Sequence, residues 1–252
     1  MKFLENDIED KNFLRYVVRF LKSGIMEDMK KYESDKGTPQ GGLISPILAN
    51  VYMHYVIGLW FEKKVKPQLK GEAYVVIYAD DFVIMFQYEE EAQKVYRALK
   101  ERLNKFGLEL AEDKTKVIPF GRQKGTKETF DFLGFTHVNG RTRTGKYTIQ
   151  HKTSKKKLKA KKEIAKKWLK ENMHKPIAMV LETLKKKLIG HYTYYGISGN
   201  FKDIQKFYKY IKYEYYRVLN RRHQKKSMRY NIYLRIWKGF KMPEPKIYVN
   251  IW

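Results

Sequence analysis

The stretch from residue 71 to residue 88, GEAYVVIYADDFVIMFQY, constrains the fold more than any other part of the chain. Two runs rich in Val, Ile, Tyr and Phe flank the tetrapeptide YADD at residues 78–81. β-branched and aromatic residues favour strands, so two such runs joined by a short link predict a β-hairpin. Side chains alternate between the two faces of a strand. Because neither arm has a polar face, we expect the hairpin to belong to a sheet that is covered on both sides.

Asp80 and Asp81 stand at the turn of this hairpin. Two adjacent carboxylates at the end of a buried hairpin repel each other, and a cation bound by both would relieve the repulsion. Asp is also common in ordinary solvated turns. The pair alone therefore leaves two interpretations open, a metal site and a plain turn.

The segment GTPQGGLISP, residues 37–46, precedes the hairpin and contains three glycines and two prolines. This composition predicts a shaped loop whose backbone can approach a ligand closely. Ser45 suits the N-cap of a helix and Pro46 its first position, and the apolar pattern continues to about Val65. Such a loop is often only a connector, but it can also hold a planar or anionic ligand against backbone amides. Gln40 is suited to bonding a base or sugar edge.

Two further helices and a possible catalytic lysine follow from the pattern around the hairpin. Apolar residues recur at helical spacing in residues 9–22 and 89–106, and Gly107 would end the second helix. Residues 108–120 predict a strand, a turn and a second strand, with Lys114 at the turn. A turn lysine is ordinarily solvated, but beside a phosphate it could protonate a leaving group.

The second half of the chain predicts a small sheet followed by helices. Residues 130–135 and 147–151 indicate an antiparallel unit. From Ser154 the pattern becomes helical, with three amphipathic stripes separated by short links, which predicts a bundle. The stripes lie in residues 158–169, 180–195 and 204–219. The tail from Lys241 contains prolines and is expected to be extended.

The net charge of +26 is confined to the second half of the chain. Residues 1–120 hold 19 basic and 19 acidic residues, whereas residues 121–252 hold 34 basic and 8 acidic ones. A charge that served only solubility would not segregate in this way. The distribution indicates a polyanion-binding module attached to a neutral one, and the tyrosines and phenylalanines among the lysines favour nucleic acid over a membrane surface.

Composition also limits the class of protein. A hydrophobic fraction of 43% supplies enough material for a core. The absence of cysteine excludes disulfides and cysteine-based zinc sites. The charged N-terminus does not resemble a signal peptide and no apolar run is long enough to span a membrane. We therefore expect an intracellular, cytoplasmic protein that does not bind a membrane.

Four segments, in this order and spacing, resemble the palm of reverse transcriptases: GTPQGGLISPILANVY, YADDFVI, GLELAEDKTKVIPFG and TFDFLGF. The type they resemble is the group II intron-encoded proteins, which are also maturases. The basic helical remainder, including GHYTYYGISGN, resembles the thumb of those proteins, also called the maturase or X domain. The resemblance implies an α+β fold, with a partial palm of antiparallel strands and helices in residues 1–152 and a helical thumb in residues 153–252.

The resemblance also implies roles for individual residues. Asp80 and Asp81 would bind Mg²⁺ ions that align a primer 3′-hydroxyl with the α-phosphate of an incoming nucleotide. Lys114 would lie beside the triphosphate as an acid. The residues against the nascent base pair would be Gly37, Thr38, Pro39, Gln40, Gly41, Gly42 and Tyr78, and those of the primer grip Phe132, Leu133 and Gly134. The lysine-rich helices would hold an RNA template with its DNA primer, or intron RNA, with salt-sensitive affinity.

The sequence departs from the family pattern in one important respect. A third carboxylate on an earlier strand, and the basic fingers before it, are not recognisable here, and neither Asp7 nor Asp10 is a convincing substitute. We therefore expect the chain alone to polymerise little, and to need a partner chain or upstream residues that supply fingers. The missing strand would leave an unpaired sheet edge and exposed apolar surface. There is also no Cys-based endonuclease module.

Two functions of different classes remain open. One is an RNA-directed DNA polymerase whose palm and thumb complete a site with fingers supplied elsewhere. The other is a non-catalytic, maturase-like protein that binds intron RNA through its thumb. The Asp-Asp pair and Lys114 favour the first, because a pure RNA binder has no use for the carboxylates. The missing third carboxylate favours the second.

Overall fold

The computed structural model describes residues 1–22, 25–27, 30–32, 44–122, 127–142, 144–222 and 227–251, and for 25–27 and 30–32 it describes the backbone alone. The chain divides into two compact units, Met1–Val117 (unit 1) and Ile118–Trp252 (unit 2). Residues 118–120 carry no charge, so the whole positive excess lies in unit 2. This division at 117/118 reflects how the chain packs. The predicted boundary between palm and thumb at 152/153 concerns function and stays a prediction.

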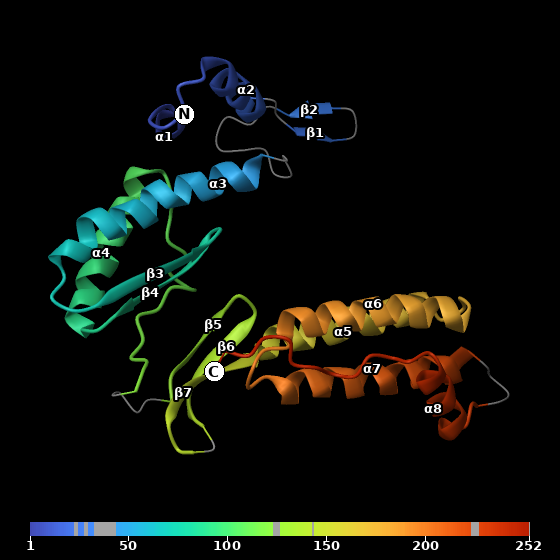
Figure 1. Ribbon diagram of the computed structural model, residues 1–252. Coiled ribbons are helices and arrows are strands. Elements are labelled where there is room, and N and C mark those ends of the chain that lie inside the picture. Colours follow the sequence, from blue (N-terminus) through green and yellow to red (C-terminus); the bar gives the residue numbers. More distant parts are fainter. Residues whose placement is uncertain are drawn as a thin grey trace. The chain divides into compact units, whose positions relative to one another are not determined.

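Unit 1 contains a hairpin and the helices that support it. The order of its elements, labelled in Figure 1, is α1 Lys2–Glu5, α2 Lys11–Lys22, β1 Ile25–Glu27, β2 Lys30–Tyr32, α3 Ser45–Met53, the π-helical η1 His54–Leu59 and η2 Phe61–Val65, the 3₁₀ turn η3 Lys66–Gln68, β3 Ala73–Tyr78, β4 Asp81–Phe86 and α4 Glu89–Lys105. The helices predicted at 9–22 and 89–106 are thus confirmed to within two residues. Asp10 caps α2, because its Oδ1 accepts hydrogen bonds from the amides of Asn12 at 2.8 Å and Phe13 at 3.1 Å.

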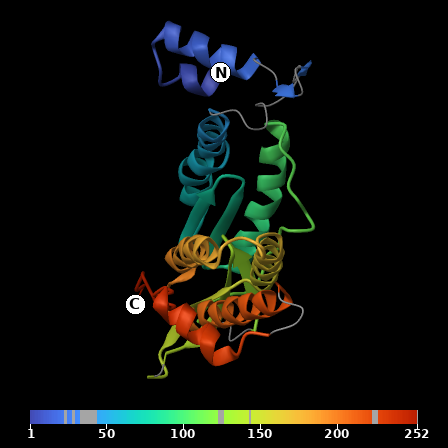
Figure 2. The same ribbon diagram turned by 90° about the vertical axis from the view of Figure 1, so that its right-hand side faces the viewer.

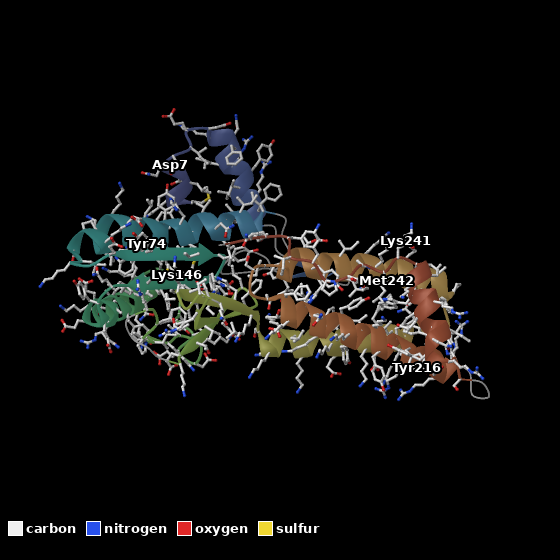
Figure 3. All side chains as sticks on the ribbon, turned by 60° about the horizontal axis from the view of Figure 1, so that its bottom comes forward. Asp7, Tyr74, Lys146, Tyr216, Lys241 and Met242 are labelled. Carbon is white, nitrogen blue, oxygen red and sulfur yellow. The ribbon has the colours of Figure 1, made fainter. Side chains whose placement is uncertain are left out.

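The predicted hairpin is present, but only one of its faces is covered. Strands β3 and β4 pair antiparallel, from Ala73 opposite Phe86 to Tyr78 opposite Asp81. The hairpin lies beside helices of unit 1 (Figure 2), and one of its faces packs on them in clusters that include Val75 and Ile84. On the other face Tyr74 is 54%, Val76 46% and Tyr78 64% exposed; Figure 3 labels Tyr74. The expectation of a sheet covered on both sides is therefore wrong for the described residues, because β3 and β4 form a two-stranded sheet with helices on one face. The expected exposed apolar surface is present.

The helix predicted from Ser45 to about Val65 is continuous but changes its winding after Met53. In a π-helical turn a carbonyl accepts from the amide five residues on instead of four, so the turn is wider than in an α-helix. Arg102, on the facing helix α4, donates to two carbonyls of this segment, from Nε to Val56 at 3.1 Å and from Nη2 to Tyr55 at 3.3 Å. Its guanidinium also lies 4.4 Å from the ring centroid of Phe106. Arg102 therefore ties α4 to the segment where the helix is unwound.

Residues 108–120 differ from the prediction of two strands. The turn is present, since the amide of Lys114 donates to the carbonyl of Ala111 at 3.0 Å. The segments on either side contain no strand, although Leu108 and Leu110 pack against the core of unit 1. Their alternation reflects contact with that core, and no neighbouring strand pairs with them among the described residues.

Unit 2 joins a three-stranded sheet to a helical bundle. Its elements are β5 Thr129–Phe132, β6 Phe135–Arg141, β7 Tyr147–Thr153, α5 Lys155–Glu171, α6 Ile177–Tyr195, α7 Phe201–Arg222 and α8 Tyr230–Gly239. The strands are antiparallel in the order β5-β6-β7, which confirms the predicted antiparallel unit. The three predicted helices lie side by side, and α8 crosses near one end of them (Figure 1). The sequence reasoning did not predict α8.

Aromatic side chains hold the core of unit 2 together. Tyr192, Tyr215, Tyr233 and Trp237 are all at most 2% exposed. The Tyr233 hydroxyl donates to the carbonyl of Lys212 at 2.5 Å, and the Trp237 indole to the Tyr208 hydroxyl at 3.0 Å. Both α8 side chains are thus bound to α7. In the described part of the chain, no helix is long and apolar enough to cross a bilayer.

Replacing Arg102 by Met should destabilise unit 1 by about 1–3 kcal/mol, because two half-buried hydrogen bonds from a charged donor are lost while the aliphatic stem is kept. Urea unfolding followed by circular dichroism measures the change. Arg97→Met, an exposed position on the same helix, is the matched control and should lie within about 0.5 kcal/mol of the parent. Equal losses in the two variants would contradict the role assigned to Arg102.

His191, on α6, should make the stability of unit 2 fall in acid. Burial, with a smaller contribution from Lys161, lowers the pKa of His191 to about 3. In the unfolded chain the imidazole takes up its proton near pH 6.5, well before it does so in the folded chain. Between those values the unfolded state therefore gains about 1.4 kcal/mol of relative stability for each unit that the pH falls.

The measurement is urea unfolding at pH 7 and at pH 5. His191→Gln should lose less stability than the parent on this change of pH, whereas His174→Gln, at an exposed histidine, should behave like the parent. An unchanged pH dependence in His191→Gln would show that another group is responsible.

Candidate active site

Asp80 and Asp81 lie at the exposed tip of the β3–β4 hairpin. Because Tyr78 pairs with Asp81, the loop consists of two residues, Ala79 and Asp80. Ala79 has a φ of 53°, in the left-handed region that hairpin loops ordinarily fill with glycine. The expectation that the carboxylates stand at a buried hairpin end is wrong, so water screens their repulsion. Both remain available to a cation that arrives with a ligand.

The base of the hairpin is fixed by a buried carboxylate. Glu91 lies in the first turn of α4, and its Oε1 accepts hydrogen bonds from the amides of Lys70 at 2.6 Å and Gly71 at 3.4 Å. The position also favours a negative charge, since the N-terminus of a helix carries partial positive charge. Glu91 therefore ties the entry of β3 to the helix that supports the hairpin.

Asp80 and Asp81 offer oxygen ligands, which Mg²⁺ prefers, and Mg²⁺ is commonly held by one or two carboxylates together with water and substrate phosphates. Their chemistry fits that ion. Among the described residues no group of three His, Cys, Asp or Glu side chains is arranged to hold a metal. Asp7 and Asp10 both have structural partners: Asp7 accepts a hydrogen bond from the Tyr55 hydroxyl, and Asp10 caps α2.

The structure does not join the other predicted site residues of the palm to the carboxylates. Lys114 is exposed in its turn, and within the described residues no ion pair links it to Asp80 or Asp81. Tyr78 is exposed on the uncovered face, directly beside the tip. The predicted loop of Gly37, Thr38, Pro39, Gln40, Gly41 and Gly42 lies outside the described residues.

The predicted primer grip, Phe132 to Gly134, is the turn between β5 and β6 in unit 2. Phe132 pairs with Phe135, so Leu133 and Gly134 form a two-residue loop. Their φ values of 49° and 80° follow the pattern of a type I′ turn. The Gly134 carbonyl accepts a hydrogen bond from the amide of Ser154 at 2.9 Å.

Two tyrosines at the end of α6 also reach this turn; the sequence predicted Tyr195 only as part of an apolar stripe and gave Tyr194 no role. The Tyr194 hydroxyl donates to the Leu133 carbonyl at 2.9 Å. A methyl group at residue 134 would lie 2.9 Å from the Tyr195 hydroxyl oxygen. Both tyrosines belong to the segment GHYTYYGISGN, in which no local pattern indicates a contact with a turn 61 positions earlier in the chain.

Lysines of unit 2 lie against aromatic rings. The ammonium nitrogen of Lys161 is 4.7 Å from the ring centroid of Tyr195, and that of Lys187 is 5.0 Å from Trp168. Nitrogen-tipped side chains extend outward along the bundle in Figure 3. With 34 basic and 8 acidic residues, this unit can bind a polyanion through many weak phosphate contacts.

A known protein family matches the first half of the chain. The family described as "Reverse transcriptase (RNA-dependent DNA polymerase)" matches residues 4–137. That span includes the hairpin with its carboxylates and the β5–β6 turn.

Individual relatives match shorter segments. The group II intron-encoded protein LtrA of Lactococcus lactis subsp. cremoris is 37% identical over 59 residues, which are 23% of this chain and 10% of LtrA. A protein of COX1/OXI3 intron 1 of Saccharomyces cerevisiae is 28% identical over 164 residues, 46% of this chain and 20% of that protein. An uncharacterized 91 kDa protein in the cob intron of Schizosaccharomyces pombe is 37% identical over 51 residues, 20% of this chain and 6% of its own. The chain thus spans at most a fifth of these relatives.

Gly134→Ala should destabilise unit 2 more than Gly145→Ala. Both glycines have a φ near 80°, so a side chain strains the backbone at either position. Only at residue 134 would the new methyl group also meet the Tyr195 hydroxyl, because at residue 145 it meets no described atom within 4 Å. We expect about 1 kcal/mol lost at residue 145 and about 2–3 kcal/mol at residue 134. Thermal unfolding followed by circular dichroism tests this, and equal losses would show that Tyr195 gives way freely.

Proposed function

The chain belongs to the reverse transcriptase (RNA-dependent DNA polymerase) family, and from that premise we propose that it forms the palm and thumb portion of a group II intron-type enzyme. The reaction is nucleotidyl transfer directed by an RNA template. The primer 3′-hydroxyl loses its proton and attacks the α-phosphate of a deoxynucleoside triphosphate. A new P–O bond forms, the bond to the β-phosphate breaks, and pyrophosphate leaves.

The observation that carries this proposal is the exposed pair Asp80 and Asp81 on a two-residue loop with a strained backbone. The two carboxylates would hold Mg²⁺, which would lower the pKa of the attacking hydroxyl and neutralise charge on the leaving group. Lys114 would act as the acid that protonates pyrophosphate. Tyr78 and the loop of residues 37–42 would contact the nascent base pair.

We further propose that the site is incomplete with these residues alone. The two carboxylates have no third acidic neighbour among the described residues. A third ligand and the fingers would come from another chain or from further residues. The uncovered apolar face that carries Val76 and Tyr78 provides a surface that such an addition would bury.

Primer extension on an RNA template with Mg²⁺ tests the proposal, first with this chain alone and then with a separately made fingers and first-strand fragment. We expect little extension by the chain alone and clear extension by the mixture. Asp80→Ala/Asp81→Ala should abolish it, with a loss of at least about a thousandfold, because the metal ligands are gone. Glu89→Ala/Glu90→Ala, an exposed acidic pair at the start of α4, is the control and should retain activity.

Each outcome decides between specific alternatives. Extension by the chain alone would show that the site is complete. Extension that survives the double Asp variant would remove the carboxylates from the mechanism. If neither preparation extends the primer, the alternative is a non-catalytic protein that binds intron RNA, which the charge of unit 2 favours. Its affinity should then fall about 10³- to 10⁵-fold between 50 and 200 mM salt if six to ten phosphates are contacted.

A further inference from the structure

The turn at Leu133 and Gly134 departs from the residue preferences of its own backbone. A type I′ loop favours Asn or Gly at the first position, because both tolerate a positive φ. Leu133 occupies that position with a φ of 49°, where a side chain of its kind is strained. Strain of this kind persists only where surrounding contacts impose it, and it occurs frequently at functional sites.

The contacts that impose this conformation come from two directions. Tyr194 of α6 donates to the Leu133 carbonyl at 2.9 Å, and the amide of Ser154 donates to the Gly134 carbonyl at 2.9 Å. The Tyr194 ring also stacks on Phe135, the first residue of β6, with ring centroids 5.9 Å apart and planes at 12°. Both carbonyls of the loop are therefore bound, one by a side chain and one by the backbone.

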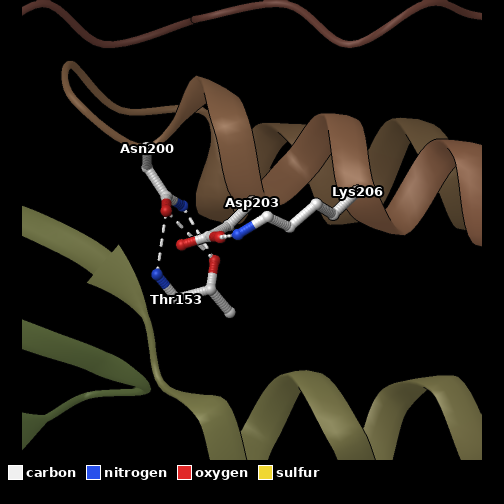
Figure 4. Close-up of polar contacts among 4 residues, drawn as sticks. All are labelled: Thr153, Asn200, Asp203 and Lys206. Atoms are coloured by element: carbon white, nitrogen blue, oxygen red, sulfur yellow. Dashed lines mark hydrogen bonds and ion pairs between the residues drawn. The ribbon is translucent and has the colours of Figure 1, made fainter.

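The end of α6 is itself held against the sheet by a buried amide. Asn200 is 1% exposed, and its Oδ1 accepts from the amide of Thr153 at 2.8 Å (Figure 4). Its Nδ2 donates to the Tyr195 carbonyl at 2.8 Å and to the Thr153 hydroxyl at 2.9 Å. Asn200 thus joins the last residue of α6 to the last residue of β7, immediately before Ser154. The two groups that hold the turn are fixed to one another.

Of the residues that hold the turn, Tyr194 contributes least to the stability of the fold. It is 52% exposed, so water could satisfy its hydroxyl if the bond to Leu133 were absent. Tyr195, by contrast, is 4% exposed and belongs to the core. A hydrogen bond from an exposed tyrosine to a strained loop adds little to stability, but it fixes where the loop lies.

We propose that Tyr194 is a positioning residue, which holds the Leu133–Gly134 turn in place against the terminal nucleotide of a primer. The proposal rests on the proposed function, in which this turn grips the primer. Tyr194 itself does not touch the reacting atoms. It acts through the Leu133 carbonyl, so its loss should change the placement of the primer end and leave overall duplex binding, which the lysines supply, almost unchanged.

The test is photo-crosslinking with an RNA template and a DNA primer that carries 4-thiothymidine at its 3′ end, using the full chain at saturating concentration. The crosslinked peptide is identified by mass spectrometry. We expect the parent to crosslink within residues 132–134. Tyr194→Phe keeps the ring and its stacking but removes the donor, and should lower that crosslink about two- to tenfold, the effect of one hydrogen bond. Tyr213→Phe, at a similarly exposed tyrosine of α7, should match the parent.

Two further readouts separate positioning from stability. In Tyr194→Phe the dissociation constant for the duplex should stay close to the parent value, and the unfolding temperature should fall by no more than a few degrees, the effect of one hydrogen bond. A crosslink equal to that of the parent would overturn the positioning role and leave the proposed primer grip intact. A parent chain that binds the duplex without any crosslink in residues 132–134 would overturn the primer grip, and the role of Tyr194 with it. If the unfolding temperature falls so far that the variant is partly unfolded under the assay conditions, unfolding explains the lost crosslink and Tyr194 is only a structural residue.

Discussion

The fold of unit 2 depends on aromatic packing that opposes a large like-charge repulsion. This compact unit holds thirty-four basic and only eight acidic residues, and its excess positive charges repel each other and favour the unfolded chain. Large buried rings supply apolar area, and Tyr and Trp also bring a polar group that can bond to the backbone or to each other. Tyr233 and Trp237 both do so, which fixes α8 against α7. Lysines such as Lys161 and Lys187 lie over aromatic rings, and the attraction between cation and ring offsets part of the repulsion. A bound polyanion would remove much of the rest.

Unit 1 differs from unit 2 because its charges balance, and its helices hold a short hairpin whose tip is exposed. Two side chains of α4 hold the hairpin and the helix before it in place. Glu91 binds the amides before β3, and Arg102 binds carbonyls of the unwound helix that leads to it. Both bond to backbone groups that regular secondary structure would have satisfied. The tip of the hairpin can therefore be exposed and still be fixed.

Local periodicity was enough to predict most elements from the sequence. The β3–β4 hairpin, α2, α4 and the three long helices of unit 2 each have a strong pattern within a short window. Residues 108–120 were predicted wrongly because Leu108 and Leu110 alternate as in a strand but pack on a core without a partner strand. The covered sheet was also predicted wrongly, since the number of layers depends on contacts distant in sequence.

In the candidate site, too, the sequence predicted what depends on neighbouring residues and missed what depends on contacts distant in the chain. Asp80 and Asp81 were found from adjacent residues, but Tyr194 and Leu133 are 61 positions apart, and no local pattern joins them. The unwinding after Met53 also escaped prediction, and Arg102, which bonds to the unwound segment, comes from another helix. Interactions of this kind appear only once the fold has brought the elements together.

Backbone strain gives an argument for function that is independent of any resemblance. Among the described residues, three non-glycine positions have a positive φ: Ala79, Leu133 and Lys241. Two of them stand in two-residue hairpin loops, one in each unit, where Gly or Asn would cost less. A chain selected only for stability would replace both, because each costs on the order of 1 kcal/mol. One of these loops carries the carboxylate pair, and the other is bound by Tyr194. Both loops keep a strained residue. This indicates that the conformation of each loop, and not only a connection between its strands, is important.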